Sequence, residues 1–199
     1  MLRRPEPGSF EHLVRAVSVP VSRLWRLSGS PAGEPYWARS ASHRFDDPLP
    51  EASQRFGVLY TAHDLATAFS ESVIHECSLH AGGRYLVPQS ELDRRAVVRF
   101  AHPRTGRLML ADMTGEALKA MGLNNDLSAG DDYTLSQQWS RALFEAKPRL
   151  AGIRYLSRQH NDAYCYALFD RCGLTCGGSS RMTQTEKGIL CQRFNVDIV

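Results

Sequence analysis

The sequence predicts one domain of the α+β class. Segments typical of strands and segments typical of helices follow one another without the regular β-α-β alternation of a doubly wound sheet. The chain has 199 residues, which is the usual size of a single domain. It contains neither a GxGxxG nor a Walker A pattern, so the sequence does not support a phosphate-binding loop of either kind.

The first clear strand signal is FGVLYTA at residues 56–62, a short apolar run of residues that favour strands. Successive side chains of a strand point to opposite faces, so Val58 and Tyr60 share one face. Residues 29–57 are rich in Gly, Ser, Pro and Ala, and they predict an irregular loop with brief extended pieces. Loops of this length are often functional.

A helix is predicted over residues 64–81. Asp64 is a suitable N-cap, and Gly82-Gly83 is a suitable stop signal. Glu71 lies off the buried face of this helix, so it can be presented to a cleft or to solvent. The buried face is defined by apolar side chains at helical spacing, namely Leu65, Phe69, Val73 and Cys77.

The rest of the chain predicts further strands and helices in mixed order. Strands are expected over residues 94–102, 106–113, 151–158 and 163–169, helices over 114–122 and 133–147, a loop over 123–132, and a last strand within the apolar stretch 189–199 that follows a Gly- and Ser-rich segment. The strands at 151–158 and 163–169 are expected to form a hairpin. On the first of them Tyr155 and Ser157 share a face, and Arg154 and Arg158 point the other way in a regular strand, so neither arginine is taken as a candidate site residue.

Composition and charge exclude several classes of protein. The net charge is +3 and the basic residues form no stripe interleaved with aromatic residues, so we expect no direct nucleic-acid partner. No apolar run approaches the roughly 18 residues that span a membrane, and the first residues lack the apolar core of a secretory signal, which predicts a cytoplasmic protein without membrane association.

The cysteines favour free thiols in a reducing compartment, because the five of them are not closely paired and include no CxxC motif. We therefore expect no bound metal. A zinc site remains the alternative, since four of them lie in the C-terminal part of the chain: Cys165, Cys172, Cys176 and Cys191.

Four polar residues in or beside apolar segments are the candidate functional residues: Arg44, Tyr60, Glu71 and Ser157. Taken singly, each has a structural explanation, respectively a surface ion pair, a core tyrosine, a solvated helix residue and a turn residue. Together they suit one task, because an arginine can grip an anionic nucleotide and a carboxylate can stabilise positive charge that develops on a sugar.

The order and approximate spacing of several motifs resemble the RES domain, a family named for a recurring Arg, Glu and Ser. These motifs are LWRL, HRFDDP, GVLYTAHDLATAFSES, DMTG, YTLSQQWSRAL and GIRYLSR followed by ALF. The resemblance covers residues 24–169. It implies a single RES-like domain over residues 1–199, with an N-terminal extension at 1–23 and a C-terminal extension at 170–199.

The resemblance also implies a fold and a site. RES domains are similar to ADP-ribosyltransferases, which have a split, mainly antiparallel β core flanked by helices, and their substrate is NAD+. By motif, Arg44 and Tyr60 would bind NAD+ and take part in catalysis with Glu71, which would stabilise the cationic ribose. Ser157 would orient the nicotinamide end of NAD+. Trp25-Arg26, in LWRL, stands where family members commonly have Tyr-Arg, so the aromatic residue differs here. Arg26 could reach a phosphate, or it could only cover apolar surface with its aliphatic stem.

The implied function is that of a toxin in a bacterial type II toxin–antitoxin pair. Such a toxin would deplete NAD+ by cleaving the nicotinamide–ribose bond with water or inorganic phosphate, and it would need no further cofactor. The implied partner is an Xre-like antitoxin in a hetero-oligomer, and a homodimer is also open. The alternatives are transfer of ADP-ribose to a protein and a non-catalytic NAD+-binding module.

Overall fold

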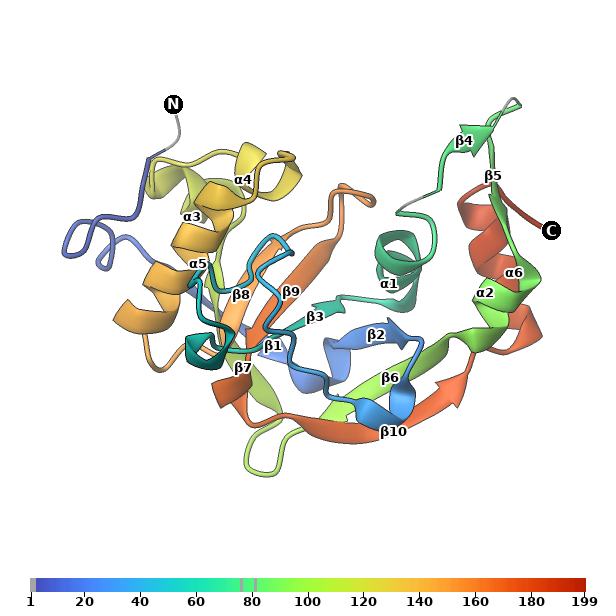
Figure 1. The fold of residues 1–199 in the computed structure, drawn as a ribbon, viewed down its shortest axis with the longest axis horizontal. Helices are drawn as coiled ribbons and strands as arrows, with labels where there is room; N and C mark the ends of the chain where they lie inside the picture. The colour runs from blue at the N-terminus through green and yellow to red at the C-terminus, as the bar shows by residue number, and fades with distance from the viewer. Residues whose placement is uncertain (1–2, 76, 81) are drawn as a thin grey trace.

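A curled eight-stranded sheet forms the centre of the molecule (Figure 1). The computed structural model describes residues 3–75, 77–80 and 82–199. The strand order is β1-β7-β8-β9-β3-β2-β6-β10, and a second sheet has the order β11-β5-β4. The strands are β1 (Ala16–Pro20), β2 (Trp25–Ser28), β3 (Val58–Ala62), β4 (Leu79–His80), β5 (Arg84–Val87), β6 (Ala96–Ala101), β7 (Arg107–Asp112), β8 (Gly152–Leu156), β9 (Tyr164–Phe169), β10 (Thr175–Arg181) and β11 (Val196–Ile198).

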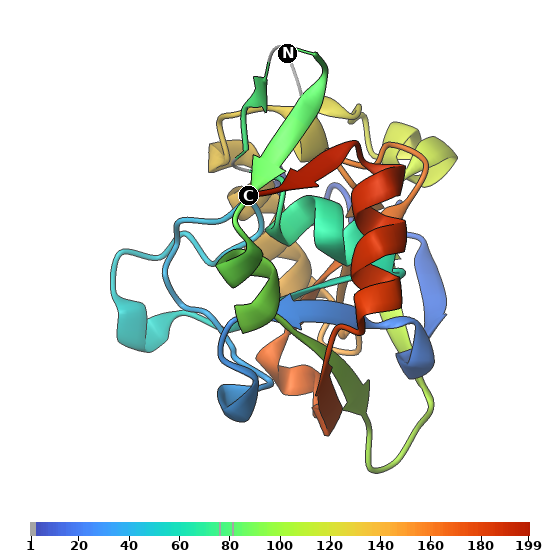
Figure 2. The ribbon, with the colours of Figure 1, turned by 90° about the vertical axis from the view of Figure 1, so that its right-hand side faces the viewer.

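Most of the helices lie toward the two ends of the sheet (Figure 1). The helices are α1 (Leu65–Ser72), α2 (Gln89–Arg94), α3 (Gly115–Ala120), α4 (Asp126–Ala129), α5 (Thr134–Ala146) and α6 (Gln184–Arg193). Helices α3, α4 and α5 lie at one end, α2 and α6 lie at the other, where Figure 2 shows β11 alongside β5, and α1 packs on β2 and β3 between the two groups. No helix in the described part of the chain is both long and apolar enough to cross a membrane.

The predicted fold class is confirmed. Within the large sheet every neighbouring pair of strands is antiparallel except β7 and β8, and helices flank the sheet. The predicted hairpin of β8 and β9 is also confirmed, with Gly152 opposite Leu168 and Leu156 opposite Tyr164. The Gly- and Ser-rich loop before β3 contains only short 3-10 turns and a single bridge to β3, as expected.

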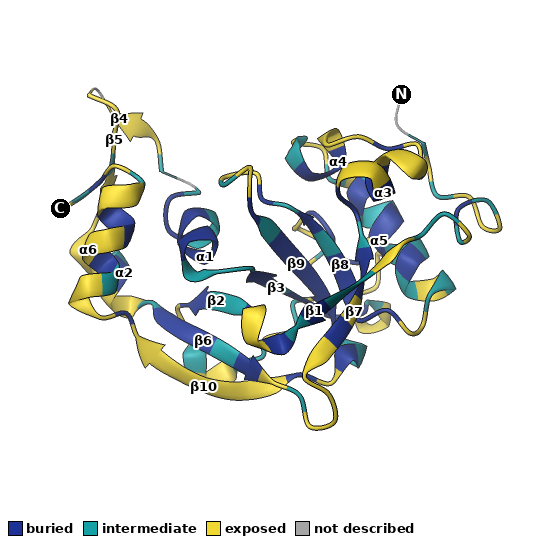
Figure 3. Ribbon diagram, turned by 180° about the vertical axis from the view of Figure 1, so that it is seen from behind, coloured by how far each residue is buried: buried dark blue, intermediate teal, exposed yellow. Residues whose placement is uncertain are grey.

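The central strands are buried on both faces, as the dark ribbon of β3, β8 and β9 shows (Figure 3). Val58 and Tyr60 pack into one hydrophobic cluster and Leu59 into the other, which confirms the predicted alternation along β3. Trp139 of α5 is fully buried and meets Phe10 edge-on at a centroid distance of 5.1 Å. The N-terminal segment is thereby packed against α5.

The sheet is nearly divided between β2 and β3. These neighbouring strands share one residue pair, Trp25 with Ala62, whereas β3 and β9 pair over five residues. We call this weak junction the seam. Arg26 crosses it, because its Nη1 atom donates a hydrogen bond of 2.9 Å to the carbonyl oxygen of Tyr60. The Arg26 side chain therefore joins β2 to β3 at a point where the two backbones are not paired.

The predicted helix over residues 64–81 is too long. Asp64 caps it as expected, accepting a hydrogen bond from the backbone N–H of Thr67, but α1 ends at Ser72. Beyond it, Leu79 and His80 pair with β5, and Leu79 is exposed. Gly82 and Gly83 both adopt positive φ at the reversal between β4 and β5, so this glycine pair ends a turn rather than a helix.

The prediction for the C-terminal tail is also partly wrong. The Gly- and Ser-rich segment forms β10, an exposed edge strand beside β6, and residues 189–193 of the stretch predicted to hold a last strand belong to α6. Only the short β11 is a strand there. Helix α6 begins with a capping box in which Thr183 and Glu186 bond to each other's backbone N–H groups. This pairing of side chains at three-residue spacing is a sequence signal for a helix start.

Candidate active site

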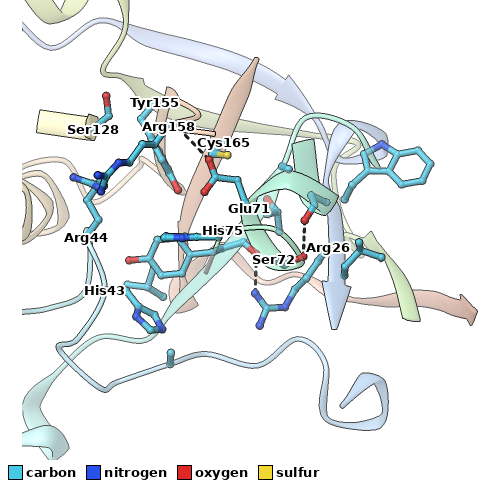
Figure 4. A pocket seen from close by; sticks show the side chains of 18 of the residues that line it. Arg26, His43, Arg44, Glu71, Ser72, His75, Ser128, Tyr155, Arg158 and Cys165 are labelled. Carbon is cyan, nitrogen blue, oxygen red and sulfur yellow. Dashed lines mark hydrogen bonds between the residues drawn. The ribbon is translucent and has the colours of Figure 1, made fainter. Parts of the chain in front are cut away.

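A cleft of about 510 Å³ opens at the seam. This volume is in the range of small-molecule sites. Its lining comes from both halves of the sheet and from the loops above them. It includes Arg26 of β2, Tyr60 of β3, Glu71 of α1, His43 and Arg44 before β3, Tyr133 before α5, Arg158 after β8, and Cys165 of β9. Figure 4 shows Glu71 between Arg44 and Arg26.

Glu71 is held by three hydrogen bonds to one of its two carboxylate oxygens. Its Oε1 atom accepts from the hydroxyl of Ser157 at 2.5 Å and from the backbone N–H groups of Arg158 at 3.1 Å and Gln159 at 3.3 Å. Within the described part of the chain, Oε2 accepts no hydrogen bond. The carboxylate is therefore fixed in orientation, with one oxygen free for a ligand.

Ser157 belongs to the site, but it contacts Glu71 rather than the open cleft. It is 2% exposed, and its hydroxyl accepts a hydrogen bond of 2.9 Å from the backbone N–H of His160 while donating to Glu71. We call α1 together with residues 157–160 the helix wall of the cleft. The role of Ser157 in this wall is to orient a carboxylate.

Tyr60 lines the cleft with its ring, while its hydroxyl is engaged elsewhere. The hydroxyl donates to Oδ1 of Asp46 at 3.0 Å and accepts from the backbone N–H of Phe45 at 2.9 Å. Burial and the nearby Asp46 carboxylate raise the pKa of Tyr60 well above its ordinary value. Tyr60 thus stays protonated and can offer a ligand its ring, which His43 meets edge-on at 5.7 Å.

Two buried aspartates organise the loop that carries Arg44, and sequence reasoning had not singled them out. Oδ2 of Asp46 accepts from the Ser40 hydroxyl and the backbone N–H of His43. Asp47 accepts from the backbone N–H of Phe56 and forms an ion pair of 2.8 Å with Arg141 of α5. We call residues 40–47 the loop wall. The available signal in the sequence was the pair of adjacent acidic residues directly after Phe45, which is buried. Carboxylates buried beside such a residue need hydrogen-bond or ionic partners, and these partners hold a loop in place.

Arg44 is 9% exposed and points across the cleft to the segment between α4 and α5. Its Nη1 atom donates to the carbonyl oxygens of Gly130 at 2.7 Å and Leu127 at 3.4 Å, and its guanidinium stacks over the ring of Tyr133 at 4.5 Å. Among the described residues it forms no ion pair with a carboxylate. Arg44 therefore carries an uncompensated positive charge at this end of the cleft.

Arg26 lies at the opposite end and is neutralised. Its Nε atom forms an ion pair of 2.7 Å with Glu34, whose side chain is only 1% exposed. The other oxygen of Glu34 accepts from the backbone N–H of Tyr36. With its Nη1 atom bonded to Tyr60, Arg26 secures the seam as well as lining the cleft.

Arg158 was not among the predicted site residues, because a regular strand would turn its side chain away from Ser157. Strand β8 ends at Leu156, so the alternation of side chains does not continue to Arg158, which lines the cleft. Its Nη1 atom forms an ion pair of 2.7 Å with Asp131, whose side chain is 88% exposed. The cleft therefore contains a third arginine that sequence reasoning had set aside.

The arrangement combines a fixed carboxylate with cations and aromatic rings. Burial and the Glu71 carboxylate raise the pKa of the Cys165 thiol well above its ordinary value, so Cys165 stays a neutral thiol beside the site. The described residues contain no group of three or more His, Cys, Asp or Glu side chains arranged to hold a metal ion. An oriented carboxylate, together with the Arg44 guanidinium that has no carboxylate partner among the described residues, can stabilise a cationic centre in a ligand that also carries negative charge.

Comparisons with known proteins point to one family. The family model of the RES domain matches residues 23–184. Among solved structures, the chain is similar to one in the crystal structure of the M. tuberculosis MbcT–MbcA toxin–antitoxin complex, with a TM-score of 0.63 and 16% sequence identity over 93% of this chain and 97% of that chain. None of the curated proteins matches the chain. At this level of identity the structural likeness shows the fold.

Proposed function

The chain belongs to the RES domain family, and from that membership we propose that it cleaves the nicotinamide–ribose bond of NAD+ with water or inorganic phosphate. We propose further that it acts in the cytoplasm as the toxin of a toxin–antitoxin pair. The observation that carries the enzymatic proposal is the Glu71 carboxylate, held through one oxygen by three donors and free at the other within the described part of the chain.

The proposed chemistry assigns Glu71 the central role. Cleavage of the nicotinamide–ribose bond passes through an oxocarbenium-like centre, as glycoside cleavage does. The free oxygen of Glu71 would stabilise this cation, or orient the water or phosphate that attacks the ribose carbon as nicotinamide leaves with the bonding electrons. Tyr60 would stack on the ligand through its ring, and Arg44 would attract its phosphates. Nicotinamide leaves as a neutral molecule, so positioning would supply most of the rate.

Ser157 and Arg26 take more limited parts in this proposal than the resemblance implies. Ser157 is engaged with Glu71 and His160, so it would position the carboxylate instead of contacting nicotinamide. Arg26 is paired with Glu34 and bonded to Tyr60, so it would shape the cleft more than it binds phosphate.

The direct test is to incubate the purified protein with NAD+, with and without phosphate, and to measure nicotinamide release. Glu71→Gln is the informative variant, because an amide oxygen can still accept from Ser157 and the two backbone N–H groups while the charge is lost. We expect turnover to fall by about 10²- to 10⁴-fold with an unchanged melting temperature. Full activity of this variant, or no nicotinamide release by folded wild-type protein, would refute the proposal.

The identity of the acceptor is tested separately. Labelled NAD+ is incubated with the protein and a cell lysate, and the products are separated on a gel and by chromatography. Free ADP-ribose, or its phosphate ester, supports degradation of NAD+. A labelled protein band would instead favour ADP-ribosyl transfer, and tight NAD+ binding without any product would favour a binding module.

The toxin proposal rests on the family and on the fold shared with a chain from a toxin–antitoxin complex. We propose that a small Xre-like protein binds this chain and covers the cleft. Expression of the chain alone is expected to arrest growth and lower cellular NAD+, and co-expression of a neighbouring helix-turn-helix gene is expected to reverse both. Arrest that persists in the Glu71→Gln variant would contradict an NAD+-depleting toxin.

A further inference from the structure

Two guanidinium groups converge on consecutive residues at one end of the cleft. Arg44 donates to the carbonyl oxygen of Gly130 at 2.7 Å, and Arg158 pairs with the side chain of Asp131 at 2.7 Å. Figure 4 shows Arg44 and Arg158 on the same side of Glu71, opposite Arg26. Two cations are thus brought to one short segment from parts of the chain more than a hundred residues apart.

This end of the cleft has little compensating negative charge. Arg44 bonds only to carbonyl oxygens and a ring among the described residues. The partner of Arg158 is Asp131, which is 88% exposed, and solvent-exposed ion pairs of this kind contribute little stability. Arg26 differs because the side chain of its partner, Glu34, is only 1% exposed. The cleft therefore has one neutral end and one positive end, with Glu71 between them.

We infer that Arg158 and Arg44 together bind the pyrophosphate of the dinucleotide, and that Arg158 leaves Asp131 to do so. This inference deepens the proposed function and rests on it. A phosphate group can accept two hydrogen bonds from a guanidinium group, whereas Asp131 accepts one from Arg158 and its side chain is 88% exposed. The nicotinamide end of the ligand then lies toward the neutral, Arg26 side of Glu71.

Arg158 also connects the phosphate site to the carboxylate. Its backbone N–H donates to Glu71 at 3.1 Å, while its side chain reaches Asp131. Removing the side chain leaves the backbone donor in place. The side chain of Arg158 is therefore expected to act on substrate affinity, whereas its backbone helps to hold the catalytic carboxylate.

The test compares two variants of one ion pair in NAD+ cleavage. Arg158→Ala is expected to raise KM for NAD+ about tenfold and to leave kcat within about twofold. Asp131→Ala is expected to lower KM about twofold, because it removes the competitor for Arg158. Opposite changes in KM for the two variants would distinguish a substrate-binding role of Arg158 from a purely structural ion pair. Equal increases in KM for both variants, or a loss of kcat alone in Arg158→Ala, would overturn the inference.

Matched controls come from an ion pair of similar exposure outside the cleft. Arg84 and Asp197 pair on the small sheet with side-chain exposures of 48% and 46%. Arg84→Ala and Asp197→Ala should leave KM and kcat unchanged. A shift in KM with either control would show that loss of surface charge alone explains the Arg158 effect, and it would overturn the inference.

Calorimetry separates the two phosphate sources and the two levels of proposal. ADP-ribose is expected to bind about tenfold more weakly to Arg158→Ala than to the wild type. Weaker binding of inorganic phosphate alone would assign Arg158 to the attacking phosphate and overturn the inference. If the wild type releases nicotinamide but Arg158→Ala has a normal KM, only this inference fails. If the wild type neither binds ADP-ribose nor releases nicotinamide, the proposed function fails with it.

Discussion

The loop wall and the helix wall of the cleft both contain carboxylates, but the hydrogen bonds are distributed differently over the carboxylate oxygens in the two walls. In the loop wall, both oxygens of Asp46 and both oxygens of Asp47 accept hydrogen bonds, and both residues are fully buried. In the helix wall, all bonds to Glu71 converge on one oxygen. A carboxylate whose bonding capacity is filled holds structure, and one with a fixed orientation and a free oxygen is available for chemistry.

The largest effect is expected from breaking the loop wall at Asp47. Asp47→Ala removes one of the two carboxylates that pair with Arg141, the other being Glu145, and it leaves the backbone N–H groups of Leu49 and Phe56 without their acceptor. We expect the free energy of unfolding to fall by about 3–5 kcal/mol, measured by urea denaturation, because each unsatisfied donor costs about 1–3 kcal/mol. Glu71→Gln serves as the comparison, with little loss of stability. Similar losses in both variants would contradict the distinction between the two walls.

A smaller loss of stability is expected from Tyr60→Phe. The variant removes the hydroxyl that joins Asp46 to the backbone N–H of Phe45, at a cost of about 1–3 kcal/mol. Because the ring remains, KM for NAD+ should change little. A large rise in KM with unchanged stability would show that the hydroxyl contacts substrate instead.

Ser157→Ala tests the helix wall and should act mainly on turnover. Glu71 loses its hydroxyl donor but keeps the two backbone donors. We expect kcat to fall about tenfold, equivalent to about 1.4 kcal/mol, with KM within about twofold. A rise in KM without a change in kcat would assign Ser157 to substrate binding, as the resemblance to RES domains implies.

The smallest effect is a pH dependence of the Tyr60 contribution. The pKa of Tyr60 is raised in the folded protein, so its stabilising effect is complete below the unfolded-state pKa near 10 and is lost as pH rises toward the folded-state pKa. The difference in unfolding free energy between the wild type and Tyr60→Phe should narrow by about 1.4 kcal/mol per pH unit above 10. A constant difference between pH 9 and 11 would contradict this.

Much of the fold could be predicted from side-chain periodicity. The errors arise where one local sequence pattern is compatible with two different structures. The alternation of Val58, Leu59 and Tyr60 is confirmed because β3 is buried on both faces. The glycine pair after α1 suits a helix stop and a hairpin turn equally well. Contacts with β5 decide between them, and these contacts are not visible in the local sequence.

The sequence predicted which residues meet at the cleft better than it predicted the hydrogen bonds that these residues form. Arg26, Arg44, Tyr60 and Glu71 line the cleft, and Ser157 bonds to Glu71. The partners of these residues depend on long-range packing, since Arg44 reaches carbonyl oxygens more than eighty positions away. Arg158 was missed because regular strand geometry was extended past Leu156, where the chain leaves the sheet.

The seam between β2 and β3 has a consequence for how the protein can diverge. The cleft opens where two strands part after a single residue pair, so its existence depends on the path of the backbone and not on small side chains. Substitutions of the residues that line the cleft would change which ligand binds, while the cleft itself would remain open. Natural variants of this chain can therefore acquire new ligand preferences by point substitution alone, while the scaffold is inherited intact.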